Sequence, residues 1–128
     1  MLTRLNPPSV PKPASRYAQG ILVPANARQL VISGQIGVTP DGKVLEGVAA
    51  QTEQAFANLF AMLAAAGMGV EDIVKVTVFL TNAADVPVYR EVRDRMLTEA
   101  AASTLLIVAG LASPAFLVEI EATAAKVA

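Results

Sequence analysis

Residues Leu105–Ala124 read LLIVAGLASPAFLVEIEATA, and this stretch decides the fold that the sequence predicts. Its two apolar runs are separated by a segment that contains Ser113 and Pro114, so we expect two strands joined by a short polar turn. Glu119 and Glu121 stand two positions apart in the second run, which places both carboxylates on one face of that strand. Because burying an unpaired carboxylate is costly, the pair is either part of a site or a solvated strand face.

Two helices are predicted upstream of this stretch. Apolar residues at three- and four-residue spacing predict the first over Gly47–Ala66, with Gln51 away from the apolar face. The second begins at Asn82 or Asp85 and runs to about Glu99. Its expected core residues are Val88, Val92 and Met96, and its expected surface charges are Arg93 and Arg95.

The remaining elements are strands. β-Branched residues predict a strand over Ile73–Leu80. Shorter strands are expected over residues 2–6, 21–24 and 29–33. With the two strands of Leu105–Ala124, the total is about six, and the alternation of strands and helices favours an α+β fold with a single sheet and both helices on one face. A length of 128 residues suits one domain, residues 1–128.

The composition is unusually apolar for a soluble monomer. Hydrophobic residues make up 54% of the chain and charged residues only 16%, whereas average domains carry roughly 25% charged residues. No apolar run approaches the roughly 20 residues that span a bilayer, so no membrane partner is expected. We therefore expect apolar surface to be hidden in a subunit interface, which makes the protein a homo-oligomer.

The absence of two residue types excludes several classes of chemistry. The chain has neither Cys nor His, which excludes disulfides, thiol nucleophiles, the Ser-His-Asp triad and the common zinc sites, so no metal is expected. A net charge of −1 without a basic stripe argues against a nucleic-acid partner. The start of the sequence, MLTRLNPPSVP, lacks the apolar core of a signal peptide, and a cytoplasmic location is expected.

Five segments, in order along the chain, resemble the Rid family, which is also called the YjgF/YER057c/UK114 family. They are PKPASRYAQG (11–20), ISGQIG (32–37), GVAAQTEQAFANL (47–59), EDIVKVTVFLTNAADV (71–86) and VEIEATA (118–124). The resemblance implies a chorismate-mutase-like α+β fold and a homotrimer whose sheets form an inner barrel. It also implies small-molecule clefts at the subunit interfaces. Family enzymes hydrolyse reactive 2-imino or enamine acids to 2-keto acids and ammonia without a metal or organic cofactor, so no cofactor is expected.

The resemblance also assigns roles to individual residues. Tyr17 matches the tyrosine that closes the family cleft, and Ser33 and Gly34 match the pair whose backbone contacts the ligand. Glu119 matches the glutamate that holds the attacking water, which makes it the expected catalytic residue. A positioned water and a carboxylate suffice for this chemistry because the substrate is already activated.

Two departures from the family pattern concern the substrate carboxylate. Family deaminases carry an arginine in a Pro-Ala-Arg-Ser string, whereas residues 101–104 read AAST here and Ser103 stands at the arginine position. A serine hydroxyl cannot replace bidentate guanidinium binding. Arg90 aligns with a cleft-facing asparagine of the family, and one hypothesis is that it returns a cation to the cleft. Ser103 and Arg90 are therefore both expected to contact the ligand.

Three functions stay open at this point. The first is a cofactor-free hydrolase of a small imine or enamine that uses a water held by Glu119. The second is a non-catalytic trimer that binds a small metabolite, which Ser103 favours. The third, ribonuclease or translation inhibitor, has been attached to some family members, and the neutral charge balance argues against it.

Overall fold

The computed structural model describes residues 1–128 and contains six strands and two α-helices, as the sequence predicts. The strands are β1 (Thr3–Leu5), β2 (Gly20–Leu22), β3 (Ala27–Ile36), β4 (Ile73–Leu80), β5 (Ala102–Ile107) and β6 (Val118–Val127). The helices are α1 (Val48–Ala65) and α2 (Val86–Met96), with short 3₁₀ turns η1 (Val70–Asp72) and η2 (Ala83–Asp85). Neither α-helix combines the length and apolarity that a membrane span requires.

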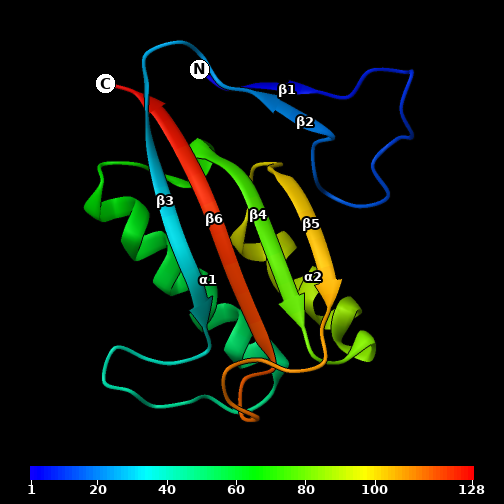
Figure 1. The fold of residues 1–128 in the computed structure, drawn as a ribbon, viewed down its shortest axis with the longest axis vertical. Coiled ribbons are helices and arrows are strands. Elements are labelled where there is room, and N and C mark those ends of the chain that lie inside the picture. The colour runs from blue at the N-terminus through cyan, green and yellow to red at the C-terminus, as the bar shows by residue number, and fades with distance from the viewer.

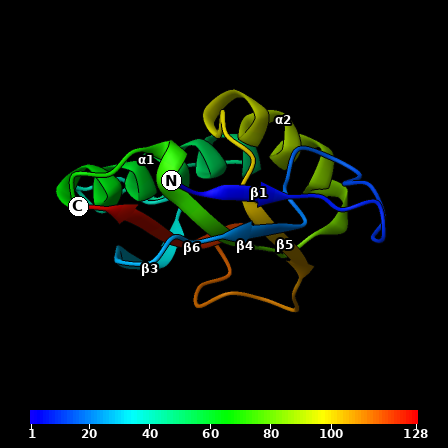
Figure 2. The same cartoon turned by 90° about the horizontal axis from the view of Figure 1, so that it is seen from above.

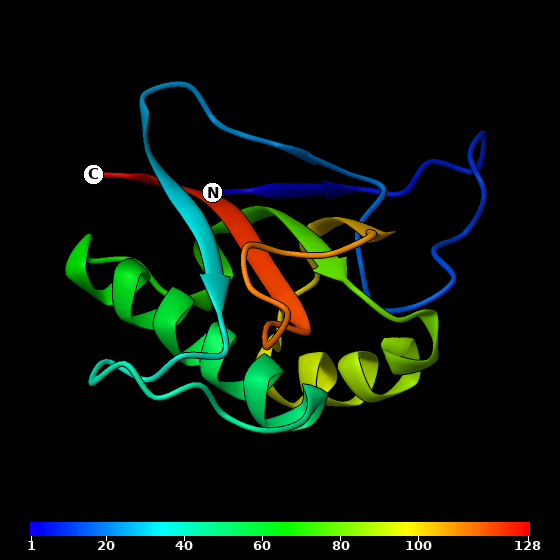
Figure 3. The ribbon, with the colours of Figure 1, turned by 60° about the horizontal axis from the view of Figure 1, so that its bottom comes forward.

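The main sheet has the strand order β3-β6-β4-β5 (Figure 1). β6 pairs antiparallel with β3 and with β4, whereas β4 and β5 run parallel. β1 and β2 form an antiparallel ribbon beyond one end of the sheet, and the segment after β1 returns to the free edge of β5 through the bridge between Ala18 and Ala102 (Figure 3). The six strands thus form a four-stranded mixed sheet and a separate two-stranded ribbon, and both helices cover the same face of the main sheet (Figure 2).

The hairpin predicted for Leu105–Ala124 is wrong, because β4 lies between β5 and β6. Residues 108–117 form a long connection instead of a tight turn, and they carry the chain past the end of β4 (Figure 1). Val108 N donates to Leu80 O at 2.8 Å, and Thr81 N donates to Leu117 O at 3.3 Å, so both ends of the connection are held beside β4. Alternation of apolar residues identifies the buried face of a strand, but it does not identify the neighbouring strand.

The hydrophobic core fills the space between the sheet and the two helices. Phe56 and Leu59 of α1 are fully buried against Val78 and Ile120 of the sheet. The ring of Phe56 also lies 6.3 Å, centroid to centroid, from the ring of Tyr89 on α2. This aromatic contact joins the two helices over the sheet, which fixes α2 next to β5.

Three side chains are placed differently from the sequence prediction. Arg93 is 4% exposed and Gln51 is 2% exposed, although both were expected at the surface, and Val88 is only half-buried. The N-terminal segment covers Arg93 through Ser15, and a loop covers Gln51. Helical periodicity describes one helix at a time, so coverage by a distant segment is invisible to it.

The second face of the main sheet has no helix over it (Figure 2). It carries apolar side chains, with Val31 76% exposed and Leu106 45% exposed, beside the polar Lys75 and Glu121. We call it the open face.

Candidate functional site

Glu119 lies on β6, which is the strand with partners on both sides. Its register partners are Ile36 on β3 and Phe79 on β4. Val118 and Ile120 are fully buried in the core, so Glu119 points to the open face, where it is half-buried.

A local irregularity in β3 makes room for this carboxylate. The register between β3 and β6 shifts between Ile32 and Gln35, so Ser33 and Gly34 have no paired residue. A Cβ atom built on Gly34 would overlap Oε2 of Glu119. The carboxylate therefore lies against the bare backbone of Gly34, which any other residue at this position would obstruct. Ser33, Gly34 and Glu119 form what we call the acid group.

A second group of predicted residues surrounds a cavity of about 190 Å³ between α2, β5 and the N-terminal segment. The cavity is lined by Ser15, Tyr17, Tyr89, Arg90, Arg93, Ser103 and Leu105. Tyr17, Arg90 and Ser103 are thus brought together from three segments that are far apart in the sequence. We call this hollow the arginine cavity. Across the whole chain, no three acidic side chains are grouped closely enough to hold a metal ion.

Arg93 is the most enclosed charged residue of the cavity wall, with 5% of its side chain exposed. Its Nε and Nη2 atoms donate to Oδ1 of Asp94 at 3.1 and 2.9 Å, and Nη1 donates to Oγ of Ser15 at 3.4 Å. Its guanidinium carbon lies 6.0 Å from the centre of the Tyr89 ring, within the range of a cation–π contact. These contacts fix the orientation of the guanidinium plane.

Tyr89 is 1% exposed, and its hydroxyl has no hydrogen-bond partner within the protein. Burial raises the pKa of this hydroxyl far above its usual value, and the charge of Arg93 opposes the rise only in part. The phenol is therefore a neutral donor at physiological pH. Sequence reasoning placed neither Tyr89 nor Arg93 in the site, although their four-residue spacing on one helix face could have suggested a joint role.

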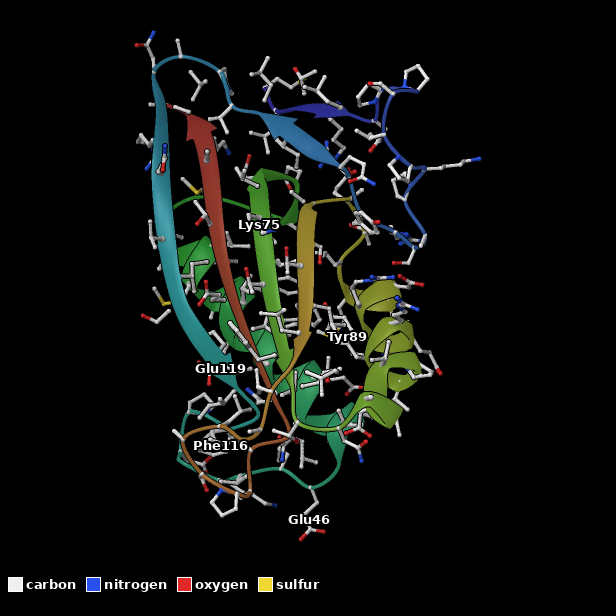
Figure 4. All side chains as sticks on the ribbon, turned by 45° about the vertical axis from the view of Figure 1, so that its right-hand side comes forward. Glu46, Lys75, Tyr89, Phe116 and Glu119 are labelled. Atoms are coloured by element: carbon white, nitrogen blue, oxygen red, sulfur yellow. The ribbon has the colours of Figure 1, made fainter.

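The two groups lie on opposite sides of the sheet within one protomer. Ser103 is in register with the buried Val76, so its side chain faces the helices, whereas Glu119 faces away from them. Figure 4 shows the separation, with Glu119 on β6 and Tyr89 between β5 and α2. A single protomer does not place the carboxylate of Glu119 in the arginine cavity.

The fold and the sequence both match known proteins. The structure of YyfB from Yersinia pestis, a protein of unknown function of the conserved Rid family, superposes with a TM-score of 0.87 at 28% identity, covering 96% of this chain and 97% of that one. The model of the family described as Endoribonuclease L-PSP matches residues 8–126. The chain belongs to the Rid family. The expected Rid-type α+β fold is thereby confirmed.

Relatives of this Rid protein include an imine deaminase. The 2-iminobutanoate/2-iminopropanoate deaminase of Salmonella typhimurium is 36% identical over 92 residues, which are 71% of this chain and 70% of the deaminase. A RutC family protein of Aquifex aeolicus is 40% identical over 82 residues, which are 63% of each chain.

Proposed function

We propose that this Rid protein is a cofactor-free hydrolase that converts a small 2-imino or enamine acid to a 2-keto acid and ammonia. The observation that carries the proposal is the carboxylate of Glu119, which lies against the Gly34 backbone on a face that no helix covers. A half-buried carboxylate on an open face, beside a glycine that carries no side chain, is suited to holding a water molecule. The imine deaminase among the relatives supports the choice of substrate class.

The proposed reaction needs only proton transfers around an activated carbon. Glu119 accepts a proton from water while the water oxygen bonds to C2 of the protonated imine, giving a neutral carbinolamine. The protonated Glu119 then returns the proton to the nitrogen, and the C2–N bond breaks. The departing ammonia takes up the hydroxyl proton as the C2 carbonyl forms. One protonated imine and one water yield one keto acid and one ammonium ion, so no electrons are exchanged with a cofactor.

We further propose that the active cleft forms between protomers of a homotrimer. The support is the separation of the acid group from the arginine cavity on opposite sides of one sheet, because a neighbouring protomer can bring the two groups together. Val31, at 76% exposure, and Leu106, at 45%, give the open face an apolar surface suited to such packing. Sedimentation of the protein as a trimer would support this arrangement, and a monomer at micromolar concentration would contradict it.

A competition assay tests the activity. An amino-acid oxidase generates 2-iminopropanoate or 2-iminobutanoate in the presence of semicarbazide, and the semicarbazone is followed by its absorbance. An active protein hydrolyses the imine first, so it lowers the initial rate of semicarbazone formation. Glu119→Gln is expected to abolish this effect, whereas Glu121→Gln, on the same face of β6, is expected to retain it. An unchanged rate across several imino acids would refute the deaminase proposal.

A second candidate function is favoured by Ser103, which stands where the family deaminases carry their carboxylate-binding arginine. In this alternative, the trimer binds a small metabolite in the same clefts without converting it. Saturable binding of a 2-keto acid by wild-type protein that shows no turnover of any imine would support it.

A further inference from the structure

The arginine cavity is lined by two arginines and by no acidic residue. Arg90 and Arg93 both line it, and none of its seven lining residues is Asp or Glu. Asp94 binds Arg93 from outside this lining. Two guanidinium groups facing one small hollow favour an anionic occupant.

Donors remain free at this lining. An arginine side chain has five N–H groups, and the three hydrogen bonds of Arg93 to Asp94 and Ser15 leave one N–H on each terminal nitrogen. The buried hydroxyl of Tyr89 has no partner. Ser103 adds a further hydroxyl from β5. An occupant with two acceptor oxygens would satisfy groups that the protomer leaves unpaired.

Arg93, rather than Arg90, is positioned to anchor such an occupant. Arg90 is exposed and takes part in neither ion pair of the structure, so its side chain must be ordered when it binds. Arg93 is already ordered by Tyr89, Asp94 and Ser15. A charge removed from water also interacts more strongly with an anion than a solvated one does.

We infer that Arg93 and Tyr89 form the carboxylate subsite of this protein, with Arg93 as the anchor and the Tyr89 hydroxyl as a second donor. The cation then comes from α2 and not from the start of β5, where Ser103 stands. The inference rests on the proposed function, because the carboxylate is that of the 2-imino acid. Binding of a keto acid can nevertheless be measured without turnover, so the two proposals can fail separately.

The chain supplies its own probe of this subsite. It contains two tyrosines and no tryptophan, and both Tyr17 and Tyr89 line the cavity. We expect pyruvate to change the tyrosine fluorescence of the wild-type protein in a saturable manner. Pyruvamide, which has the same size but no carboxylate, is expected to produce no saturable change over the same concentrations.

Variants locate the anchor. Arg93→Gln is expected to weaken pyruvate binding by about tenfold or more, because a charge-assisted pair is lost. Arg93→Lys keeps the charge without the planar fork and is expected to bind with intermediate affinity. Arg95→Gln, which changes an exposed arginine of the same helix paired with Glu53, is the matched control with unchanged affinity. Far-ultraviolet circular dichroism of each variant verifies the fold.

Tyr89→Phe keeps the ring and removes only the hydroxyl, and it is expected to weaken pyruvate binding without unfolding the protein. Tyr89→Phe also tests the carboxylate subsite if the Arg93→Gln protein does not fold. Wild-type affinity in folded Arg93→Gln or in Tyr89→Phe overturns the inference, as does equal binding of pyruvamide and pyruvate.

Turnover separates this inference from the proposed function. In an active enzyme, Arg93→Gln is expected to raise KM for the imino acid while Glu119→Gln lowers kcat. If pyruvate binding depends on Arg93 but no imine is turned over, the result supports the carboxylate subsite and contradicts the deaminase proposal. If the imine is turned over and Arg93→Gln leaves KM unchanged, the result supports the deaminase proposal and contradicts the carboxylate subsite.

Discussion

The acid group and the arginine cavity are built in opposite ways. Glu119 lies over a position where a side chain is missing, on a face that no helix covers. Arg93 and Tyr89, by contrast, are almost fully enclosed and belong to the contacts that join α2 to the rest of the molecule. Damage to the first group should therefore change activity and leave stability alone, whereas damage to the second should change both.

The largest loss of stability is expected at the arginine cavity, from Tyr89→Ala. Removing a fully buried ring that packs on Phe56 should lower the free energy of unfolding by about 3–5 kcal/mol. Tyr89→Phe should change it by less than about 1 kcal/mol, since the hydroxyl has no partner to lose. Urea unfolding of the three proteins measures both values, and similar losses in the two variants would contradict this account of the ring.

A smaller loss is expected from Gln51→Leu, which tests how the acid group is supported. Gln51 Nε2 donates to the carbonyls of Leu45 and Ala115 at 3.0 and 2.9 Å, and Leu117 N donates to its Oε1 at 2.8 Å. Without these bonds, the segment that leads into β6 loses its anchor, at a cost of about 2–3 kcal/mol.

The imine assay should also show a lower kcat for Gln51→Leu, because Glu119 follows the loosened segment directly. Gln54→Leu is the matched control on the same helix, since Gln54 bonds only to the neighbouring Asn58. Equal stability of the two variants would show that Gln51 does not anchor the segment.

Alkaline pH should lower the free energy of unfolding through Tyr89 of the arginine cavity, by less than the Gln51→Leu substitution does. The folded state raises the pKa of Tyr89, whereas in the unfolded chain the hydroxyl loses its proton near pH 10. The contribution of the protonated Tyr89 hydroxyl to the free energy of unfolding is therefore complete below about pH 10. It falls as the pH rises further, by at most about 1.4 kcal/mol per pH unit. Urea unfolding between pH 9 and about pH 11 measures the slope. Wild-type protein and Tyr89→Phe should diverge there, and parallel curves would exclude a role for this hydroxyl.

The smallest effect on stability is expected at the acid group itself, from Gly34→Ala. The added methyl group meets the flexible end of Glu119, which can move aside, so the cost should stay below about 1 kcal/mol. The displaced carboxylate should nevertheless lose activity by about 100-fold.

Gly37→Ala is the variant to compare with Gly34→Ala. Its methyl group would meet the backbone of α1 at Gln51, which cannot move aside as the flexible end of Glu119 can. Retained activity in a stable Gly34→Ala protein would show that the position of Glu119 against Gly34 is not required.

The sequence predicts the local elements well and the long-range contacts poorly. Alternation over Ile73–Leu80 correctly identifies the buried residues Val76 and Val78. It does not reveal that β6 pairs with both β3 and β4, because the side chains of a strand alternate between its two faces whichever strand lies beside it. Arg93 was expected at the surface as a charge that pairs with acidic neighbours of its own helix, and the segment that covers it lies far away in sequence.

For the candidate site, the resemblance to the Rid family identified residues that the structure places in two groups. Tyr17, Arg90 and Ser103 line one cavity, and Glu119 lies against Gly34. Their roles in binding and catalysis remain predictions. Tyr89 was missed because an unpartnered hydroxyl becomes visible only when every neighbour is known.

The central position of β6 has a consequence for how the protein is made. Ala27, the first residue of β3, pairs with Val127, so β3 has no partner in the sheet until the sixth strand has been synthesised. At roughly 5–20 residues per second, the ribosome leaves β3 and one edge of β4 unpaired for several seconds. Pairing across almost the whole chain also slows folding. The nascent protein should therefore depend on chaperones more than its small size suggests, and shortening β6 should cause aggregation during synthesis.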